Sequence, residues 1–120
     1  MVEESVLIYH ITYHQAWKQA LQIGSYQGDT LATEGFIHCS TREQVIQTAD
    51  RYYRGQSDLV LLCIEPGRVE AEIRYEALVG SEEFPHIYGP LDVAAVRQVA
   101  ALDPDGDGFF SMSPGLVWDE

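Results

Sequence analysis

Two six-residue strings share one layout, and they constrain the fold of this chain more than any other feature. His10–Gln15 and His38–Glu43 both read H-x-[S/T]-x-x-[E/Q], and each lies between a short apolar run and a segment with helical spacing. The hydroxyl residue and the longer side chain three positions later fit a capping box, which satisfies free N–H groups at a helix start. The sequence therefore predicts two strand-to-helix junctions, capped by Thr12 with Gln15 and by Ser40 with Glu43.

Hydrophobic spacing predicts the remaining elements. In chain order we expect strands at 5–11, 35–39, 59–64, 69–76 and 96–102, helices at 12–23 and 41–54, and a helical turn at 92–95. Gly24 should end the first helix, the polar segment 25–34 should be a loop, and Pro66-Gly67 should close a hairpin. The run 59–64 is wholly apolar, which is typical of a central strand covered on both faces.

These elements predict an α+β fold in which a small mixed or antiparallel sheet packs with two main helices. The 120 residues suffice for one domain with a hydrophobic core, so we expect a single domain over 1–120. The apolar content of 46% and charged content of 22% are those of an ordinary globular protein.

Charge and cysteine content limit the expected partners and setting. A formal net charge of −12 disfavours nucleic acid and anionic membranes. No apolar stretch approaches the roughly 20 residues of a membrane span, and the acidic start argues against a secretory signal. Cys39 and Cys63 lie in separate strand-like runs without CxxC spacing, so we expect a reduced, cytoplasmic protein.

The paired histidines are the first candidate site. Residues two apart in a strand share a face, so His10 should lie beside Thr12, and His38 beside Ser40. A single strand histidine is usually a core group with satisfied nitrogens, but two in matched contexts favour a functional pair. Helix starts offer N–H donors and partial positive charge, so a small phosphate-bearing molecule is the expected partner.

The string Phe84–Pro90, which reads F-P-H-I-Y-G-P, is the second candidate site. Its prolines and aromatic residues predict a stiff loop, and rigid loops on a scaffold often carry sites. A pocket role for His86 or Tyr88 stands against a simple structural turn. Glu76, at the end of the preceding strand, fits either a carboxylate that orients a histidine or ribose hydroxyl, or a partner of Arg74.

Four histidines also raise the question of a metal site. His10, His38 and His86 are the residues that zinc would use, but no ligand spacing specifies such a site. The strand-to-helix break between His10 and His14 spoils the one-face geometry of a helical pair. We therefore expect no metal.

Four strings together resemble one family, the small bacterial and plant family named domain of unknown function 952. They are Ile8–Ile11, Glu34–Thr41, Arg74–Glu76 and Phe84–Leu91, and the likeness covers residues 7–102. The resemblance implies a compact α+β fold similar to ADP-ribosyltransferases, including the RNA 2′-phosphotransferase branch. In those enzymes a first-strand histidine and a later histidine-bearing strand help to bind NAD.

The resemblance also implies roles for individual residues. His10 matches the first-strand position that contacts NAD, and His38 with Ser40 and Thr41 matches the second motif. Transferases also use a carboxylate that stabilises the ribosyl cation. No motif here matches that carboxylate, for which Glu76 and Glu83 are the candidates, and His86 occupies the loop where it is expected.

Two functions from different classes follow. The first is an enzyme, or an enzyme-derived pocket, that binds NAD or another ADP-ribose-containing nucleotide, with candidate catalytic residues His10, His38, Glu76 and His86. Its candidate cofactor-binding residues are His10, Thr12, His38, Ser40, Thr41 and Tyr88. The alternative is a non-catalytic module that recognises a small acid, a phosphopeptide or a partner protein. A histidine–metal hydrolase is a third, weaker reading.

Overall fold

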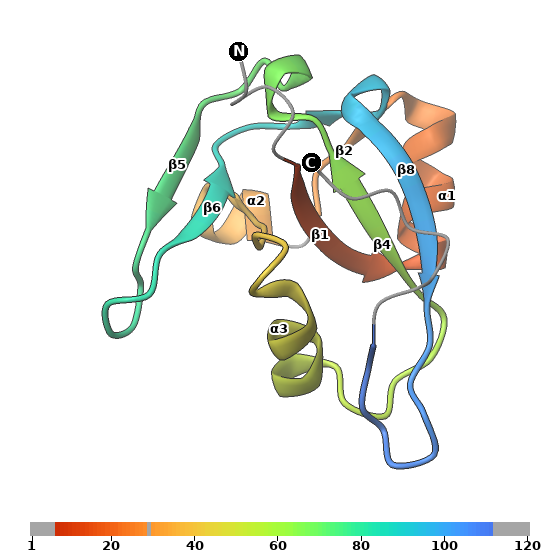
Figure 1. The fold of residues 1–120 in the computed structure, drawn as a ribbon. Coiled ribbons are helices and arrows are strands. Elements are labelled where there is room, and N and C mark those ends of the chain that lie inside the picture. Colours follow the sequence, from red (N-terminus) through yellow and green to blue (C-terminus); the bar gives the residue numbers. More distant parts are fainter. Residues whose placement is uncertain (1–6, 29, 112–120) are drawn as a thin grey trace.

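The computed structural model describes residues 7–28 and 30–111, which form an α+β fold of antiparallel sheets (Figure 1). The main sheet has the order β1-β4-β8 and contains β1 (Ile8–Tyr13), β4 (Leu59–Ile64) and β8 (Val96–Leu102). A second sheet has the order β3-β6-β5 and contains β3 (Ile37–His38), β6 (Phe84–Ile87) and β5 (Ile73–Glu76). The short strands β2 (Ser25–Tyr26) and β7 (Leu91–Asp92) pair with each other. The predicted α+β class is therefore confirmed, although the described strands form three antiparallel sheets instead of one small sheet.

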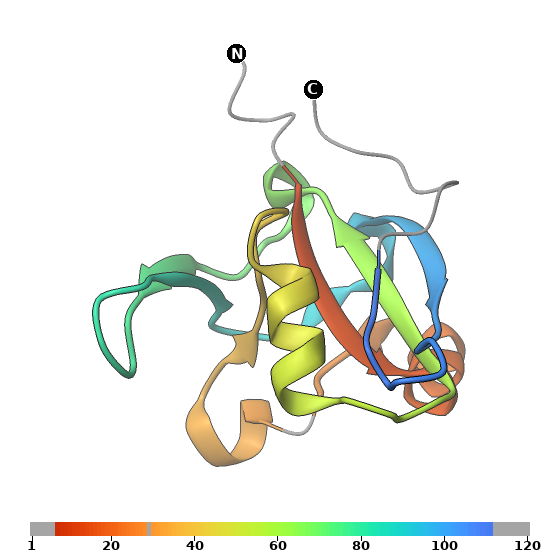
Figure 2. The same cartoon turned by 60° about the horizontal axis from the view of Figure 1, so that its bottom comes forward.

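Three α-helices lie in the described part of the chain: α1 (His14–Ile23), α2 (Thr30–Glu34) and α3 (Val45–Tyr52). Short 3₁₀ turns, η2 (Pro66–Arg68) and η3 (Val93–Ala95), follow β4 and precede β8. In both views α3 lies between the β5–β6 hairpin and the main sheet (Figures 1 and 2). None of the described helices has the length and apolar character needed to cross a membrane.

The core lies on both faces of the main sheet because every residue of β4 is buried. Alternate residues of a strand point to opposite faces, so Val60, Leu62 and Ile64 pack with Trp17 of α1. The intervening residues Leu59, Leu61 and Cys63 pack on the other side, with Val45 and Ala49 of α3. The wholly apolar run therefore forms the doubly covered central strand that the sequence predicts.

Several predicted elements are confirmed, with small differences in their bounds. The strand at 59–64 and the helical turn before 96–102 lie where expected. Gly24 ends α1 in the left-handed region, with φ 94°, and donates its N–H to the Ala20 carbonyl. The first strand begins at Ile8 in the structure, and its predicted start at residues 5–6 lies outside the described residues.

Both predicted capping boxes are wrong. Thr12 belongs to β1, the N-cap of α1 is Tyr13, and no side chain caps that helix. The second helix begins at Val45 rather than residue 41, again without a side-chain cap at its N-cap residue. β1 continues to Tyr13 because its backbone pairs with β4 over that length. β3 is shorter than the strand predicted at 35–39, and Ser40, two residues after it, pairs with Tyr9 as an isolated bridge. The hydroxyls of Thr12 and Ser40 therefore make other contacts.

The predicted hairpin at Pro66-Gly67 is also wrong. This pair lies in the 3₁₀ turn η2, and the following strand, β5, pairs with β6 instead of β4. Both edges of β4 are already occupied by β1 and β8, so β5 has no free edge there. Of the expected strand at 69–76, only Ile73–Glu76 is β-structure.

Two segments expected to be loops contain regular structure. The segment 25–34 contains β2 and α2, and Phe84–Ile87 forms β6. Proline has no N–H to donate to a neighbouring strand. Pro85 is still tied into the sheet, since its carbonyl accepts a hydrogen bond from the Cys39 N–H. The second candidate site is therefore a strand flanked by two others, which holds it more firmly than a loop.

Candidate functional site

A cleft of about 630 Å³ collects most of the predicted site residues. Its lining residues come from β1, β2 and α2, from β3 and the two residues after it, from α3 and the segment that follows it, and from β6 and the connection that precedes it. The predicted site residues that line it are His10, Thr12, His38, Ser40 and His86. Glu76, Tyr88 and Thr41 are not lining residues. Volumes of roughly 300–1,000 Å³ are typical of small-molecule and cofactor sites.

Strand pairing brings His38 and His86 together. The two residues are direct partners in the antiparallel register of β3 and β6, and their ring centroids are 5.2 Å apart. Ile37 and Ile87, the neighbours of these histidines, point to the opposite face and are fully buried in the core. The period-2 geometry of the strands therefore directs both imidazoles to the face that lines the cleft.

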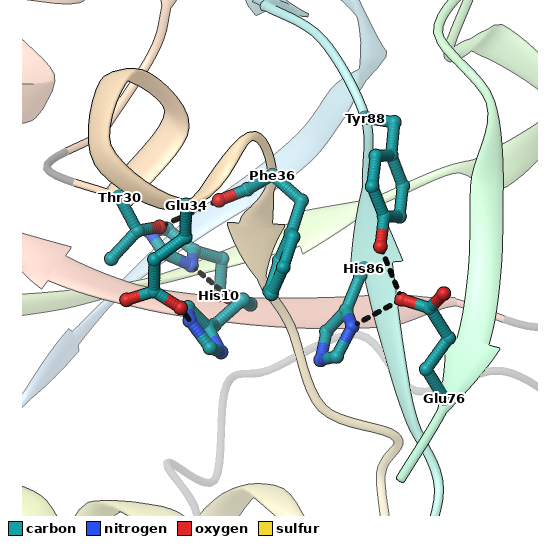
Figure 3. Close-up of polar contacts among 8 residues, drawn as sticks. His10, Thr30, Glu34, Phe36, Glu76, His86 and Tyr88 are labelled. Atoms are coloured by element: carbon teal, nitrogen blue, oxygen red, sulfur yellow. Dashed lines mark hydrogen bonds and ion pairs between the residues drawn. The ribbon is translucent and has the colours of Figure 1, made fainter. Parts of the chain in front are cut away.

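His86 is held by Glu76 and Phe36, and Tyr88 in turn holds Glu76. Its Nδ1 donates to Oε1 of Glu76 at 2.9 Å, and its ring stacks on Phe36 with centroids 4.2 Å apart (Figure 3). The same Glu76 oxygen accepts a hydrogen bond of 2.5 Å from the Tyr88 hydroxyl. The imidazole is only 2% exposed, so its orientation is determined by packing as well as by hydrogen bonding.

The carboxylate of Glu76 is the electrostatic centre of this group. Hydrogen bonds from Tyr88 and then from His86 hold the pKa of the Glu76 carboxyl below its usual value. The hydrogen bond between Tyr88 and Glu76 also raises the pKa of the Tyr88 hydroxyl. Arg74 does not pair with Glu76: its guanidinium lies 3.0 Å from Glu72. Of the two roles considered for Glu76, the structure therefore gives it that of a carboxylate that orients a histidine.

His38 has a carboxylate partner of its own. Its Nε2 lies 3.0 Å from Oε1 of Glu34, the last residue of α2. Both side chains are partly exposed, at 41% for His38 and 45% for Glu34. His38 is therefore the more accessible of the two paired imidazoles, and α2, which the sequence analysis missed, positions it.

His10 is a satisfied member of the cleft wall. Its Nδ1 lies 2.5 Å from the His38 carbonyl, and its Nε2 lies 2.7 Å from the Tyr26 hydroxyl. That hydroxyl also lies 2.9 Å from Oγ1 of Thr12, which is buried. Because both ring nitrogens are engaged within the protein, His10 holds β1 to β2 and to the β3 backbone.

The hydroxyls of the second string have structural contacts too. Ser40 is buried and donates to Oγ1 of Thr48 at 3.3 Å, on the flank of α3. The Thr41 N–H donates to the Gln44 side chain at 3.0 Å, just before α3. The cleft is lined by this flank of α3, through Thr48, Arg51 and Tyr52, and not by the helix start. The expected helix N-terminus beside His38 is therefore not part of the site.

Few permanent charges line the cleft. Among the described lining residues they are Arg51 and Glu82, one of each sign. Cys39 also lines it, but burial raises the pKa of its thiol, so it is not a reactive thiolate. In the part of the chain that the structure describes, no three His, Cys, Asp or Glu side chains are grouped as metal ligands.

Sequence reasoning missed several residues that shape the site: Tyr26, Glu34, Phe36 and Glu82. Phe36 had a usable signal, since it lies two residues before His38 and so shares its face. Glu34 precedes His38 by four residues, but this spacing predicts a contact between the two side chains only once it is known that α2 ends at Glu34. Tyr26 and Glu82 reach the cleft through long-range packing, which leaves no local pattern.

The chain is similar to solved structures of one protein. A crystal structure of protein CC0527 from Caulobacter crescentus is 40% identical, with a TM-score of 0.81, and the match covers 88% of this chain and 93% of that one. The solution NMR structure of CC0527 has a TM-score of 0.76 at the same identity, covering 86% and 90% of the two chains.

No curated protein sequence matches the chain. The family model described as protein of unknown function (DUF952) matches residues 11–99, which is most of the chain. These residues include the strands β3 and β6 of the cleft, the whole of β4, and parts of β1 and β8. The chain therefore belongs to the DUF952 family.

Proposed function

We propose that the cleft binds NAD or another nucleotide of the ADP-ribose type. One observation carries this proposal: His38, His86 and the hydroxyl-bearing residues Ser40 and Thr48 line one cleft of about 630 Å³. Imidazole nitrogens and hydroxyls suit ribose hydroxyls, and the aromatic residues of the same cleft suit a nucleobase or nicotinamide ring. An ADP-ribosyltransferase-like arrangement of the fold is part of the proposal.

The roles within this site differ from those that the sequence suggested. His38 and His86 are the proposed ligand-contacting imidazoles, because each has one nitrogen on a carboxylate and the other available. His10 and Thr12 support the wall through Tyr26, since their polar atoms are already engaged. Tyr88 acts on the ligand only through Glu76 and His86.

The position of Glu76 favours binding without group transfer as the second candidate function. A carboxylate that stabilises a ribosyl cation has to face the ligand, whereas Glu76 is held against His86 and Tyr88 and is not a lining residue. Glu82 is the carboxylate that lines the cleft, and it is the residue to examine if transfer is found.

Calorimetric titration with NAD and with ADP-ribose tests the proposal. His38→Ala should weaken binding about tenfold or more, because a hydrogen bond to a buried ligand group is lost. His14→Ala is the matched control, since His14 is an exposed histidine outside the cleft and should leave affinity unchanged. Absence of binding to both nucleotides, or equal affinity of the His38 variant and the parent, would refute the proposal.

A further inference from the structure

The hydrogen-bonding state of the two paired imidazoles determines which ligand groups the cleft accepts. A carboxylate oxygen only accepts hydrogen bonds, so the contact with Glu76 places a proton on Nδ1 of His86. In the neutral ring the other nitrogen, Nε2, is then an acceptor. By the same reasoning, the contact with Glu34 protonates Nε2 of His38 and leaves Nδ1 as its acceptor.

These two acceptor nitrogens are available to a ligand. Within the described residues, no side chain or backbone group forms a hydrogen bond with Nε2 of His86 or Nδ1 of His38. An acceptor requires a donor, and ribose hydroxyls or amide N–H groups supply one. Phosphate oxygens are acceptors, so they do not match the acceptor nitrogen of a neutral imidazole.

Negative charge around the paired imidazoles also disfavours a phosphate group next to His38 and His86. Glu34 and Glu76 lie 3.0 and 2.9 Å from the two histidines, and Glu82 is a third carboxylate, in the cleft wall. Arg51 is exposed on α3, next to the exposed Tyr52, at the outer part of the cleft. Anionic groups of a ligand are therefore repelled from the histidines and attracted toward Arg51.

The outer part of the cleft is apolar. Large hydrophobic side chains that are exposed and line the cleft come from three separate segments: Tyr13, Tyr52, Leu78 and Val79. Leu78 and Val79, which are 59% and 90% exposed, lie in the connection between β5 and β6. Gln44 fixes the far side of this connection by donating to the Glu83 carbonyl at 2.7 Å. Exposed apolar side chains gathered at one opening indicate a binding surface for an apolar or aromatic group.

We infer that the cleft takes the nucleoside end of its ligand and leaves the phosphates outside. The ribose hydroxyls donate to His38 and His86, the base packs against the apolar opening, and the phosphates extend past Arg51 to solvent. This inference rests on the proposed function and narrows it, since it assigns the affinity to base and sugar and not to the pyrophosphate.

The experiment is a calorimetric comparison of NAD, ADP-ribose, nicotinamide riboside, adenosine and inorganic pyrophosphate on the full chain. We expect one of the two nucleosides to bind within about tenfold of NAD, and pyrophosphate not to displace it. Leu78→Ser should weaken nucleoside and NAD binding by a similar factor, about tenfold, through lost apolar contact. Leu21→Ser is the matched control, because Leu21 is 54% exposed on α1 and does not line the cleft.

The outcomes separate this inference from the proposed function. If NAD or ADP-ribose binds while neither nucleoside does, or if pyrophosphate displaces NAD, the inference is wrong and the proposed function stands. If a nucleoside binds while NAD and ADP-ribose do not, the cleft does not tolerate the phosphates that the inference places in solvent, and both the inference and the proposed function are wrong. If none of the five compounds binds, both are wrong.

Discussion

His86 donates a hydrogen bond to Glu76 across a diagonal of the β5–β6 ladder, because the residue directly opposite His86 is Arg74 and the one opposite Glu76 is Phe84. Diagonal neighbours on one face of an antiparallel pair are within reach of long side chains. The contact selects the His86 tautomer whose acceptor nitrogen is Nε2. The face of this small sheet thus determines the chemistry that the cleft offers to a ligand.

Tyr88→Phe should raise the pKa of the Glu76 carboxyl toward its usual value. The Tyr88 hydroxyl is the main cause of the lowered pKa, and phenylalanine removes that donor while the ring is kept. Carbon-13 NMR titration of the glutamate carboxyl groups measures the shift. Tyr75→Phe is the control, since Tyr75 alternates to the other face of β5 and should leave the titration of Glu76 unchanged. An unaltered Glu76 midpoint in Tyr88→Phe would show that the hydroxyl does not stabilise this carboxylate.

Tyr26→Phe should destabilise the fold by about 1–2 kcal/mol. The Tyr26 hydroxyl connects Nε2 of His10 with Oγ1 of the buried Thr12, so its removal leaves both atoms without this partner. Urea unfolding measures the loss, with Tyr52→Phe as the control, because Tyr52 is 66% exposed and its ring is retained. If Tyr26→Phe and Tyr52→Phe had equal stabilities, His10 and Thr12 would not be the structural pair that the hydrogen bonds indicate.

Local sequence patterns correctly predicted the elements that can be recognised without knowing which other strand or helix they pack against. The wholly apolar run Leu59–Ile64 indicates a buried strand wherever its neighbours lie, and Gly24 ends a helix through its own backbone freedom. The turn before β8 is likewise local, since Asp92 accepts a hydrogen bond from the Ala94 N–H. For these elements the short-range physics and the final fold agree.

Local sequence patterns could not predict which distant strands pair with each other. The alternation before Glu76 predicts a strand but not its partner, and the choice of β6 depends on β4 being enclosed by β1 and β8. The capping boxes failed for a related reason, because the hydroxyls of Thr12 and Ser40 bind Tyr26 and Thr48 instead of helix N–H groups. The histidines were recognised, but their carboxylate partners emerge only from the assembled sheet.

Gly24→Ala should destabilise the protein by about 1 kcal/mol or more, because an alanine at φ 94° is strained. No atom lies within 4 Å of a Cβ built there, so the effect isolates backbone conformation from steric overlap. Gly67→Ala is the matched control, since that site is equally open and its φ is not in the left-handed region. Urea unfolding should therefore separate the two variants. Equal stability would mean that the helix end relaxes without cost.

Glu76→Gln should change how stability depends on pH. The folded-state pKa of Glu76 lies below its usual value, so the contacts with Tyr88 and His86 add stability above the unfolded-state pKa, near 4.3. That stability is lost as the pH falls through the lower, folded-state value. We therefore expect the stability gap between wild type and Glu76→Gln to be largest near pH 7 and to narrow on acidification. Urea unfolding from pH 7 to pH 3 measures the gap, and Glu70→Gln, which removes an exposed carboxylate without touching His86 or Tyr88, controls for net charge. A gap that stays constant down to pH 3 would mean that the ionised carboxylate does not stabilise this face of the sheet.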